Sequence, residues 1–307
     1  MPFTKTIHAL QFGTTGQLAR ELTKAASGLS EFSVRALSHS QADFQYPALV
    51  AKAALDSGPI DIVINATAYT AVDKAESEPG LARQINTNSV AALAKACHAR
   101  NIPLIHVSTD YVFDGRKDEP YLERDTPNPL GVYGVTKLEG EDAIRTNLGL
   151  HAIIRTSWVY SAHGTNFVKT ILRLGAQRDV LRIVDDQHGA PTSASNLANA
   201  ILAIAKQIVT NRKSDLFGTF HYADRGETTW RRFAEAIFEI AGPAAQIRAR
   251  VVPIASAEYS TPAARPSNSR LDCTKIESTY RIARKPWRES LVRVIDEIVA
   301  AQTGGVK

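Results

Sequence analysis

The chain of 307 residues contains few sulfur-bearing side chains: two cysteines and one methionine. Cys97 and Cys273 lie far apart and form no CxxC pair, so the sequence offers no cysteine metal motif and no disulfide framework. Long apolar runs are also lacking, since none approaches the ~20 residues that a membrane-spanning helix needs. The amino-terminal segment predicts a first strand rather than a signal peptide. We therefore expect a cytoplasmic protein with no membrane partner.

Charge of one sign is not concentrated anywhere in the chain. The net charge is +5, and no run of lysine or arginine with interleaved aromatic residues marks a nucleic-acid-binding face. The balance suits a phosphate-bearing ligand, but a mildly basic surface without a function explains it as well. The content of 44% hydrophobic and 22% charged residues is typical of a globular protein. We expect no nucleic-acid partner.

What the first half does contain is a regular alternation of short apolar strands and longer helical segments. The expected strands are 7–12, 32–37, 61–66, 104–108 and 152–156, and the expected helices are 17–26, 47–55, 81–100 and 132–146. This order predicts an α/β fold with a doubly wound, Rossmann-like parallel sheet. Because such sheets bind ligands at the carboxyl ends of their strands, we expect function to cluster after Phe12, Ala66, Ser108 and Thr156.

The second half is less regular. The expected helices are 167–176, 195–209, 229–241 and 287–302, the expected strands are 180–184 and 217–222, and 260–270 has loop composition. We predict a dinucleotide-binding domain at 1–156, with part of 180–215 rejoining it. Residues 157–307 would form mainly a smaller carboxyl-terminal substrate-binding lobe.

The segment from Gly13 to Ala19 follows the first strand and opens a helix. Gly13 permits a tight turn, and Gly16 lets a pyrophosphate approach the helix start, where Gln17 and Leu18 would also contact the cofactor. A simple strand–helix turn is the alternative. The second strand ends without an acidic residue to hold a ribose hydroxyl, which slightly favours NADPH and leaves NADH open.

Tyr133 and Lys137 are four residues apart in an expected helix and would project from one face. A nearby ammonium favours the phenolate, so we expect Lys137 to lower the Tyr133 pKa toward the working pH of an acid–base catalyst. Such pairs also occur by chance. Thr109 or Ser108, at the end of the fourth strand, offers a hydroxyl for a substrate oxygen, with strand-end capping as the alternative. Together these groups predict a nicotinamide-dependent reductase of carbonyl groups.

Several further segments resemble the extended short-chain dehydrogenase/reductase family, and they follow one another in the family's order. They are NATAYTAVDKAE at 65–76, STDYVFDG at 108–115, RTSWVY at 155–160, DQHGAPT at 186–192 and RPSNSRLD at 265–272. Two positions depart from the family pattern, Thr67 in place of alanine and Ala19 in place of the last glycine. Neither departure affects the expected chemistry.

The resemblance implies roles for individual residues. It implies a catalytic triad of Thr109, Tyr133 and Lys137; a cofactor lined by Asn65, Ala66, Thr67, Ala68 and Tyr69, with Asp43 and Phe44 at its adenine end; and substrate contacts from Asp110, Trp158 and Arg265. Apart from the resemblance, the position of Trp158 after the fifth strand allows two interpretations. It is either a flat surface for a deoxysugar methyl group or a core residue. Arg265 is either a diphosphate clamp or a solvated loop residue.

The resemblance also implies a substrate. It is dTDP-4-dehydro-L-rhamnose, whose C4 keto group would be reduced with NADPH or NADH to give dTDP-L-rhamnose. Alternatives are another nucleotide-sugar reductase, an epimerase of the same fold, or a non-catalytic regulatory subunit. Some family members bind magnesium at a dimer contact; Asp185 and Asp186 are the only nearby candidates here and lack a clear third ligand, so we claim no metal site and leave a magnesium requirement open. A homodimer stays open.

Overall fold

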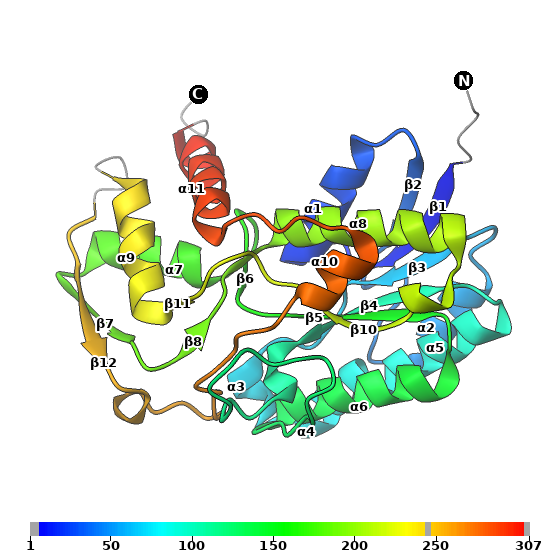
Figure 1. Cartoon of the computed structure of the whole chain (residues 1–307), viewed down its shortest axis with the longest axis horizontal. Coiled ribbons are helices and arrows are strands. Elements are labelled where there is room, and N and C mark those ends of the chain that lie inside the picture. Colours follow the sequence, from blue (N-terminus) through cyan, green and yellow to red (C-terminus); the bar gives the residue numbers. More distant parts are fainter. Residues whose placement is uncertain (1–5, 243–246, 304–307) are drawn as a thin grey trace.

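The computed structural model describes residues 6–242 and 247–303. Its centre is a six-stranded sheet in which every pair of neighbours is parallel (Figure 1). The strand order is β10 (Gly218–His221), β5 (His151–Thr156), β4 (Leu104–Thr109), β3 (Ile62–Asn65), β1 (Ile7–Phe12) and β2 (Phe32–Leu37). The prediction of a doubly wound parallel sheet is confirmed.

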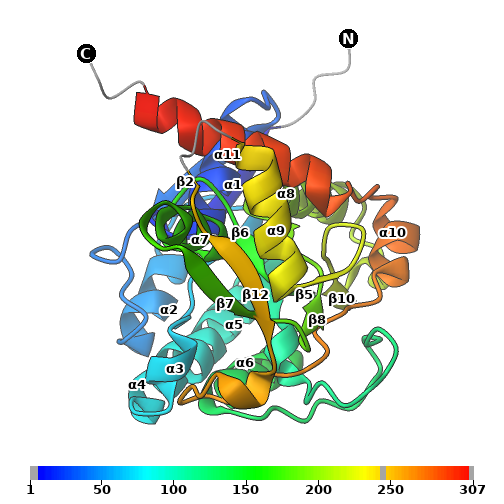
Figure 2. The same ribbon diagram turned by 90° about the vertical axis from the view of Figure 1, so that its left-hand side faces the viewer.

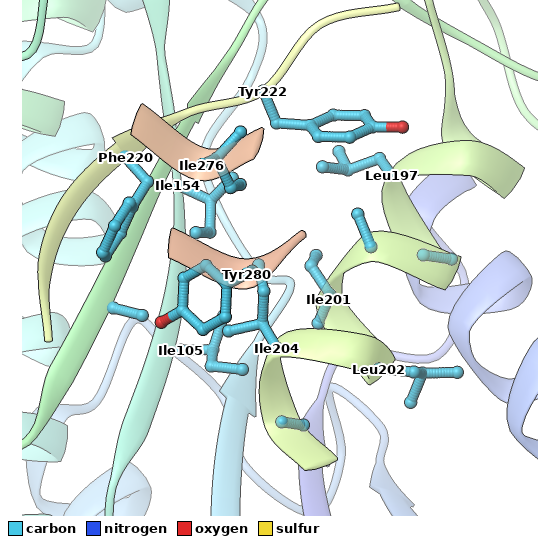
Figure 3. Close-up of a cluster of buried hydrophobic side chains, with 14 of the residues drawn as sticks. Ile105, Ile154, Leu197, Ile201, Leu202, Ile204, Phe220, Tyr222, Ile276 and Tyr280 are labelled. Atoms are coloured by element: carbon cyan, nitrogen blue, oxygen red, sulfur yellow. The ribbon is translucent and has the colours of Figure 1, made fainter. Parts of the chain in front are cut away.

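Helices cover both faces of this sheet. Successive residues of a strand point to opposite faces, and the strands here carry apolar side chains on both, so each face needs a layer of helices. One face carries α1 (Gln17–Ser27), α8 (Ala194–Asn211) and α10 (Thr274–Tyr280); the other carries α2 (Pro47–Leu55), α5 (Ser89–Ala99) and α6 (Val132–Asn147). Figure 3 shows Ile201 and Ile204 of α8 gathered with Ile105 of β4 and Tyr280 of α10. On the opposite face, Leu10 and Val63 belong to a separate buried cluster with α2 and α5.

The second lobe has its own apolar core. It contains α7 (Phe167–Gln177), α9 (Trp230–Ala241), α11 (Trp287–Thr303) and the parallel pair β7 (Val180–Val184) and β12 (Arg250–Ile254). Figure 2 shows β7 and β12 side by side, with α7 and α9 against them. Short pairs join the remaining segments: β6 (Val159–Tyr160) with β9 (Thr192–Ser193), and β8 (His188–Gly189) with β11 (Thr228–Thr229).

The second half of the chain returns to the main sheet more extensively than predicted. The expected rejoining part, 180–215, includes α8, but β10 and α10 lie beyond it and also pack on the sheet domain. A four-residue edge strand carries too weak a pattern to be assigned to one lobe. The boundary at residue 156 stays a prediction.

The expected helix at 81–100 is interrupted. It consists of α4 (Pro79–Arg83), a π-helical turn at Gln84–Asn88 and α5. The sequence analysis also missed β12, α10 and the short α3 (Val72–Ala75). None of the helices formed by residues 6–242 and 247–303 combines the length and apolarity that crossing a membrane requires.

Candidate active site

A cavity of about 550 Å³ opens at the carboxyl ends of the parallel strands. Most of the predicted site residues line it: Gly16, Gln17, Leu18, Ala66, Thr67, Ala68, Thr109, Asp110, Tyr133, Lys137 and Trp158. The carboxyl ends of β3, β4 and β5 and the turn after β1 therefore meet at one place, as the rule for parallel sheets requires.

The turn after β1 leaves room for an anion. Gly13 has a φ of 102°, a left-handed conformation that favours glycine, and a Cβ atom there would lie 3.0 Å from the Thr67 hydroxyl oxygen. A Cβ atom on Gly16 would meet nothing within 4 Å, and no side chain caps the start of α1. The first N–H groups of α1 therefore suit a pyrophosphate, and the residues present fit a dinucleotide.

Glycines within and after the Tyr133–Lys137 segment set how closely α6 approaches its neighbours. A Cβ atom on Gly134 would overlap the carbonyl oxygen of Tyr111, and one on Gly140 would overlap that of Asn86. The start of α6 can therefore lie directly against the loop after β4. This packing brings Tyr133 beside Tyr111, with ring centroids 5.5 Å apart.

The expectation that Lys137 lowers the Tyr133 pKa is wrong for this structure. Burial raises the pKa of Tyr133 to about 12, and a hydrogen bond with Thr109 only partly opposes this. Burial also lowers the pKa of Lys137 to about 8, against the opposing charge of Glu141. The Lys137 Nζ donates to the Val107 carbonyl at 2.7 Å. Removal from water therefore decides the direction of both pKa shifts.

Thr109 both caps a helical turn and lines the cavity, while its contact with a substrate oxygen stays a prediction. Its hydroxyl oxygen accepts the Tyr111 N–H at 3.2 Å and donates to Asp110 Oδ1 at 3.1 Å. Asp110 is only 3% exposed, and burial raises its pKa to about 6. Hydrogen bonds with Ser269 and Thr109 only partly oppose this effect of burial. A carboxyl group with a raised pKa thus lies beside the Thr109 hydroxyl.

Trp158 both lines the cavity and packs in the second lobe, while its contact with a sugar methyl group stays a prediction. It lines the cavity, and its ring stacks on Trp230 with a centroid distance of 3.6 Å. Its φ of 49° is strained for a bulky residue. A Cβ atom on Gly189 would lie 2.5 Å from the indole, so that glycine makes room for the ring. The second lobe therefore holds one aromatic wall of the cavity in a fixed orientation.

Some predicted residues lie outside the cavity lining. Phe44 is buried against Phe12, and Asp43 accepts the Gln45 N–H at 2.8 Å. Tyr69 donates its hydroxyl hydrogen to Glu78 at 2.8 Å. Their proposed cofactor contacts stay predictions.

Arg265, the expected diphosphate clamp, is held by a carboxylate. Its guanidinium donates to Asp73 Oδ2 at 2.8 Å and to the Ala263 carbonyl at 3.2 Å. Asp73 directly follows Val72, which lines the cavity. Arg265 therefore lies near the rim without entering the lining.

The two acidic candidates for magnesium are occupied by protein groups. Asp185 accepts from Thr229 and pairs with Arg231 at 2.7 Å, and Asp186 accepts from the Ser256 hydroxyl at 2.6 Å. Within residues 6–242 and 247–303, no three acidic, histidine or cysteine side chains gather as a metal site would require.

A loop from the second lobe closes the cavity beside the nucleotide turn, and the sequence analysis missed it. Gly164, Thr165 and Asn166 line the cavity. Gln17 Oε1 accepts from Ser161 Oγ at 3.0 Å and from Asn166 Nδ2 at 2.9 Å. Asn166 also caps α7, and an asparagine before an apolar helical run is the signal that points to it.

The fold and the hydroxyl, phenol and ammonium groups around one nucleotide-sized cavity define a reductase of the extended short-chain dehydrogenase/reductase class. The family model described as RmlD substrate binding domain matches residues 7–300. The chain belongs to this family.

Relatives and solved structures agree with this assignment. A dTDP-4-dehydrorhamnose reductase of Sinorhizobium fredii is 44% identical over 283 residues, covering 92% of this chain and 95% of that protein. A crystal structure of a dTDP-4-dehydrorhamnose reductase from Clostridium acetobutylicum is 36% identical with a TM-score of 0.87, covering 95% and 99% of the two chains. One from Bacillus anthracis in complex with NADP is 31% identical with a TM-score of 0.86 and the same coverage.

Proposed function

We propose that the chain reduces the C4 keto group of dTDP-4-dehydro-L-rhamnose to give dTDP-L-rhamnose, with NADPH or NADH, in dTDP-rhamnose biosynthesis. The observation that carries the proposal is the placement of Thr109, Tyr133 and Lys137 around the cavity that the nucleotide turn also lines. The names of the relatives support the choice of sugar. The NADP in the Bacillus anthracis structure supports NADPH as the preferred cofactor.

The electrostatics of the site suit an acid at Tyr133. Because burial raises its pKa to about 12, Tyr133 enters the reaction protonated and gives its proton to the oxygen on C4 as negative charge builds there. The reduced nicotinamide, when bound, supplies the hydride for C4. One hydride and one proton thus convert the ketone to an alcohol, and Tyr133 is left as a phenolate that must regain a proton.

Other residues position the reactants. Thr109 orients the keto oxygen, and Lys137 in its charged form holds the nicotinamide ribose. Trp158 offers a flat apolar surface to the sugar's methyl group, and Arg265 binds the diphosphate. Asp110, buried beside Thr109, contacts the sugar and holds the Thr109 hydroxyl.

The proposal is tested by measuring oxidation of NADPH and NADH against a panel of dTDP- and GDP-linked keto-sugars. We expect turnover with dTDP-4-dehydro-L-rhamnose, and its absence would overturn the substrate. Tyr133→Phe is expected to lower kcat at least ~10²-fold, the usual contribution of a positioned acid. Tyr46→Phe removes the hydroxyl of a tyrosine that is 58% exposed and is expected to leave kcat unchanged.

The same preparation separates the alternatives. NAD⁺ that stays bound through purification would indicate an epimerase, because an epimerase returns the hydride to its sugar. Capture of a partner enzyme without turnover would indicate a regulatory subunit.

We also propose a cytoplasmic homodimer without nucleic-acid partners. Two buried free thiols fit a reducing compartment, and light scattering of the purified protein checks the dimer.

A further inference from the structure

A chain of buried hydrogen bonds leads from β3 to the catalytic lysine. Asn65 on β3 and His106 on β4 are fully buried, and Lys137 on α6 is 1% exposed. Asn65 Nδ2 lies 3.0 Å from His106 Nδ1, and His106 Nε2 lies 3.3 Å from Lys137 Nζ. Neither Asn65, for which the resemblance implied a cofactor contact, nor His106 lines the cavity.

The backbone fixes the direction of these hydrogen bonds. The Thr67 N–H can only donate, and it lies 3.0 Å from Asn65 Oδ1. The Asn65 amide must therefore present its NH₂ group to His106, whose Nδ1 accepts. A neutral imidazole carries one proton, so that proton is on Nε2. His106 stays neutral, because burial and the nearby Lys137 lower its pKa well below its usual range.

The imidazole N–H thus points at the lysine nitrogen. An ammonium has no lone pair to accept it, whereas a neutral amine accepts the imidazole N–H and still donates to the Val107 carbonyl at 2.7 Å. We propose that Asn65 and His106 are positioning residues for the proposed reduction: their fixed hydrogen-bond polarity stabilises the neutral amine form of Lys137.

Among the titratable groups around Lys137, His106 is the one whose N–H specifically favours the neutral amine. On α6 the titratable neighbours are Tyr133 and Glu141, and Glu141 favours the charged amine. Toward the sheet the groups are His106 and, beyond it on β5, His151. Burial outweighs Glu141 and lowers the pKa of Lys137 to about 8. The His106 N–H, 3.3 Å from the amine, acts in the same direction as burial in this proposal.

A lysine whose pKa is lowered can act as a proton donor in the proposed catalytic cycle. After Tyr133 protonates the sugar oxygen, its phenolate takes a proton from the Lys137 ammonium, and the resulting amine accepts the His106 N–H. Lys137 then regains a proton from solvent. The inference rests on the proposed function for this use, but the protonation states can be measured without turnover.

The first measurement is the tautomer of His106, read from ¹⁵N shifts in protein labelled at its eight histidines. His106→Leu identifies the signals, and His98→Leu, at an exposed position of α5, is the matched control. We expect Nε2 to be protonated and Nδ1 unprotonated between roughly pH 6.5 and 9, the range above the usual pKa of an imidazole. Asn65→Asp offers only acceptor oxygens and is expected to move the proton to Nδ1.

The second measurement is the pH midpoint of Lys137 acylation by a trace reagent, read by mass spectrometry. We expect a midpoint near 8 in the unchanged protein. In His106→Leu it should rise by roughly half a unit to one unit, the equivalent of one hydrogen bond, and His98→Leu should not move it. Asn65→Asp should raise it further, because the new carboxylate adds its charge to the change of tautomer. His106→Gln, which returns an N–H donor, should restore the lower midpoint.

Two results would overturn the inference: a proton on Nδ1 in the unchanged protein, or a folded Asn65→Asp protein whose Lys137 midpoint does not move. If His106→Leu fails to fold, Asn65→Asp carries the test alone. Failure of the keto-sugar assay would overturn the proposed function but would leave these two readings intact, so the two failures are distinguishable.

Discussion

Asp110 keeps a carboxyl group almost entirely out of water at the centre of the site. Its raised pKa means that the folded protein binds a proton more tightly there than the unfolded chain does. This group therefore costs stability once the pH exceeds its unfolded value of 3.8, and the full cost is reached above about 6. Unfavourable burial of this kind is common where a charge serves a reaction.

We predict that Asp110→Asn is more stable than the unchanged protein at pH 8, by about 1–3 kcal/mol from a shift of roughly two pKa units. The gain should shrink as the pH falls from 6 toward 4, because the carboxyl group is then protonated in both states. Urea unfolding at several pH values measures it. Asp142→Asn, whose side chain is 64% exposed, should change stability by less than ~0.5 kcal/mol at either pH. A gain at Asp110 that is independent of pH would contradict the explanation.

Single residues differed in how much of their role the sequence could predict. Tyr133, Lys137 and Thr109 were predicted because a helical spacing and a strand end place them in one crevice. The direction of the Tyr133 pKa shift was not, because it depends on how deeply the fold buries the phenol. No sequence pattern predicted a role for His106. A histidine inside a buried strand can be assigned a role only once the fold shows its contacts with Asn65 on β3 and Lys137 on α6.

Helix α6 is placed by a close approach to the π-helical turn at Gln84–Asn88. The Asn86 side chain accepts the Tyr69 N–H at 2.9 Å and donates to Thr136 at 3.2 Å, which ties the loop after β3 to α6. Its backbone carbonyl lies against Gly140. The π-helical turn, a form that occurs mostly as a single turn within an α-helix, thus contacts both the loop after β3 and α6.

We predict that Gly140→Ala destabilises the protein by about 1–3 kcal/mol, the usual cost of overpacking. The new methyl group would overlap the Asn86 carbonyl, so α6 must move and carry Tyr133 and Lys137 with it. Urea unfolding measures the loss of stability, and kcat measures the displacement of the two site residues. We expect both the free energy of unfolding and kcat to fall.

The control for this change is Gly80→Ala in α4, where a Cβ atom would meet nothing within 4 Å. There the higher helix propensity of alanine should leave stability unchanged or raise it by up to ~1 kcal/mol. If both alanines stabilised the protein, the close approach of α6 to the π-helical turn would not be a constraint.

Several elements were predicted to the residue, among them β1, α2 and even β2, whose alternation is weak. The π-helical turn was not, because the apolar spacing over 81–100 fits one continuous helix and the extra residue per turn depends on contacts with α6. The short pairs of the second lobe were missed for a similar reason. Strands of two residues, such as β8 and β11, exist only through their partner.

At the scale of the whole molecule, the cavity lies where the sheet domain meets the second lobe, and both contribute walls. Gly16 and Lys137 come from the first, and Trp158 and Asn166 follow the fifth strand. A lobe built from a later part of the chain could be predicted from the loss of regular alternation. Which of its loops reach the cavity could not, because those contacts depend on the relative placement of the two cores.

One ion pair crosses this junction at the rim. Arg265 pairs with Asp73 of α3, and the Ala263 N–H also donates to Asp73. The pair is partly exposed, so its own contribution to stability is small. If Arg265 binds the diphosphate of the substrate as proposed, Asp73 competes with that diphosphate for the same guanidinium. The hydrogen bond from Arg265 lowers the pKa of Asp73, which therefore stays charged near neutral pH and keeps competing.

We predict opposite effects from the two partners. Arg265→Ala should raise KM for the nucleotide sugar by roughly 10-fold or more, the range of a lost charge-assisted contact, with kcat little changed. Asp73→Ala should lower KM by a few-fold, because the guanidinium is released. In the double variant the benefit of removing Asp73 should vanish, since it acts only through Arg265. Glu227→Ala, which breaks the exposed pair with Arg270, removes the same charge elsewhere and should leave KM unchanged. Equal decreases in KM for Asp73→Ala with and without Arg265 would mean that the carboxylate merely repels the substrate and that the arginine is not its clamp.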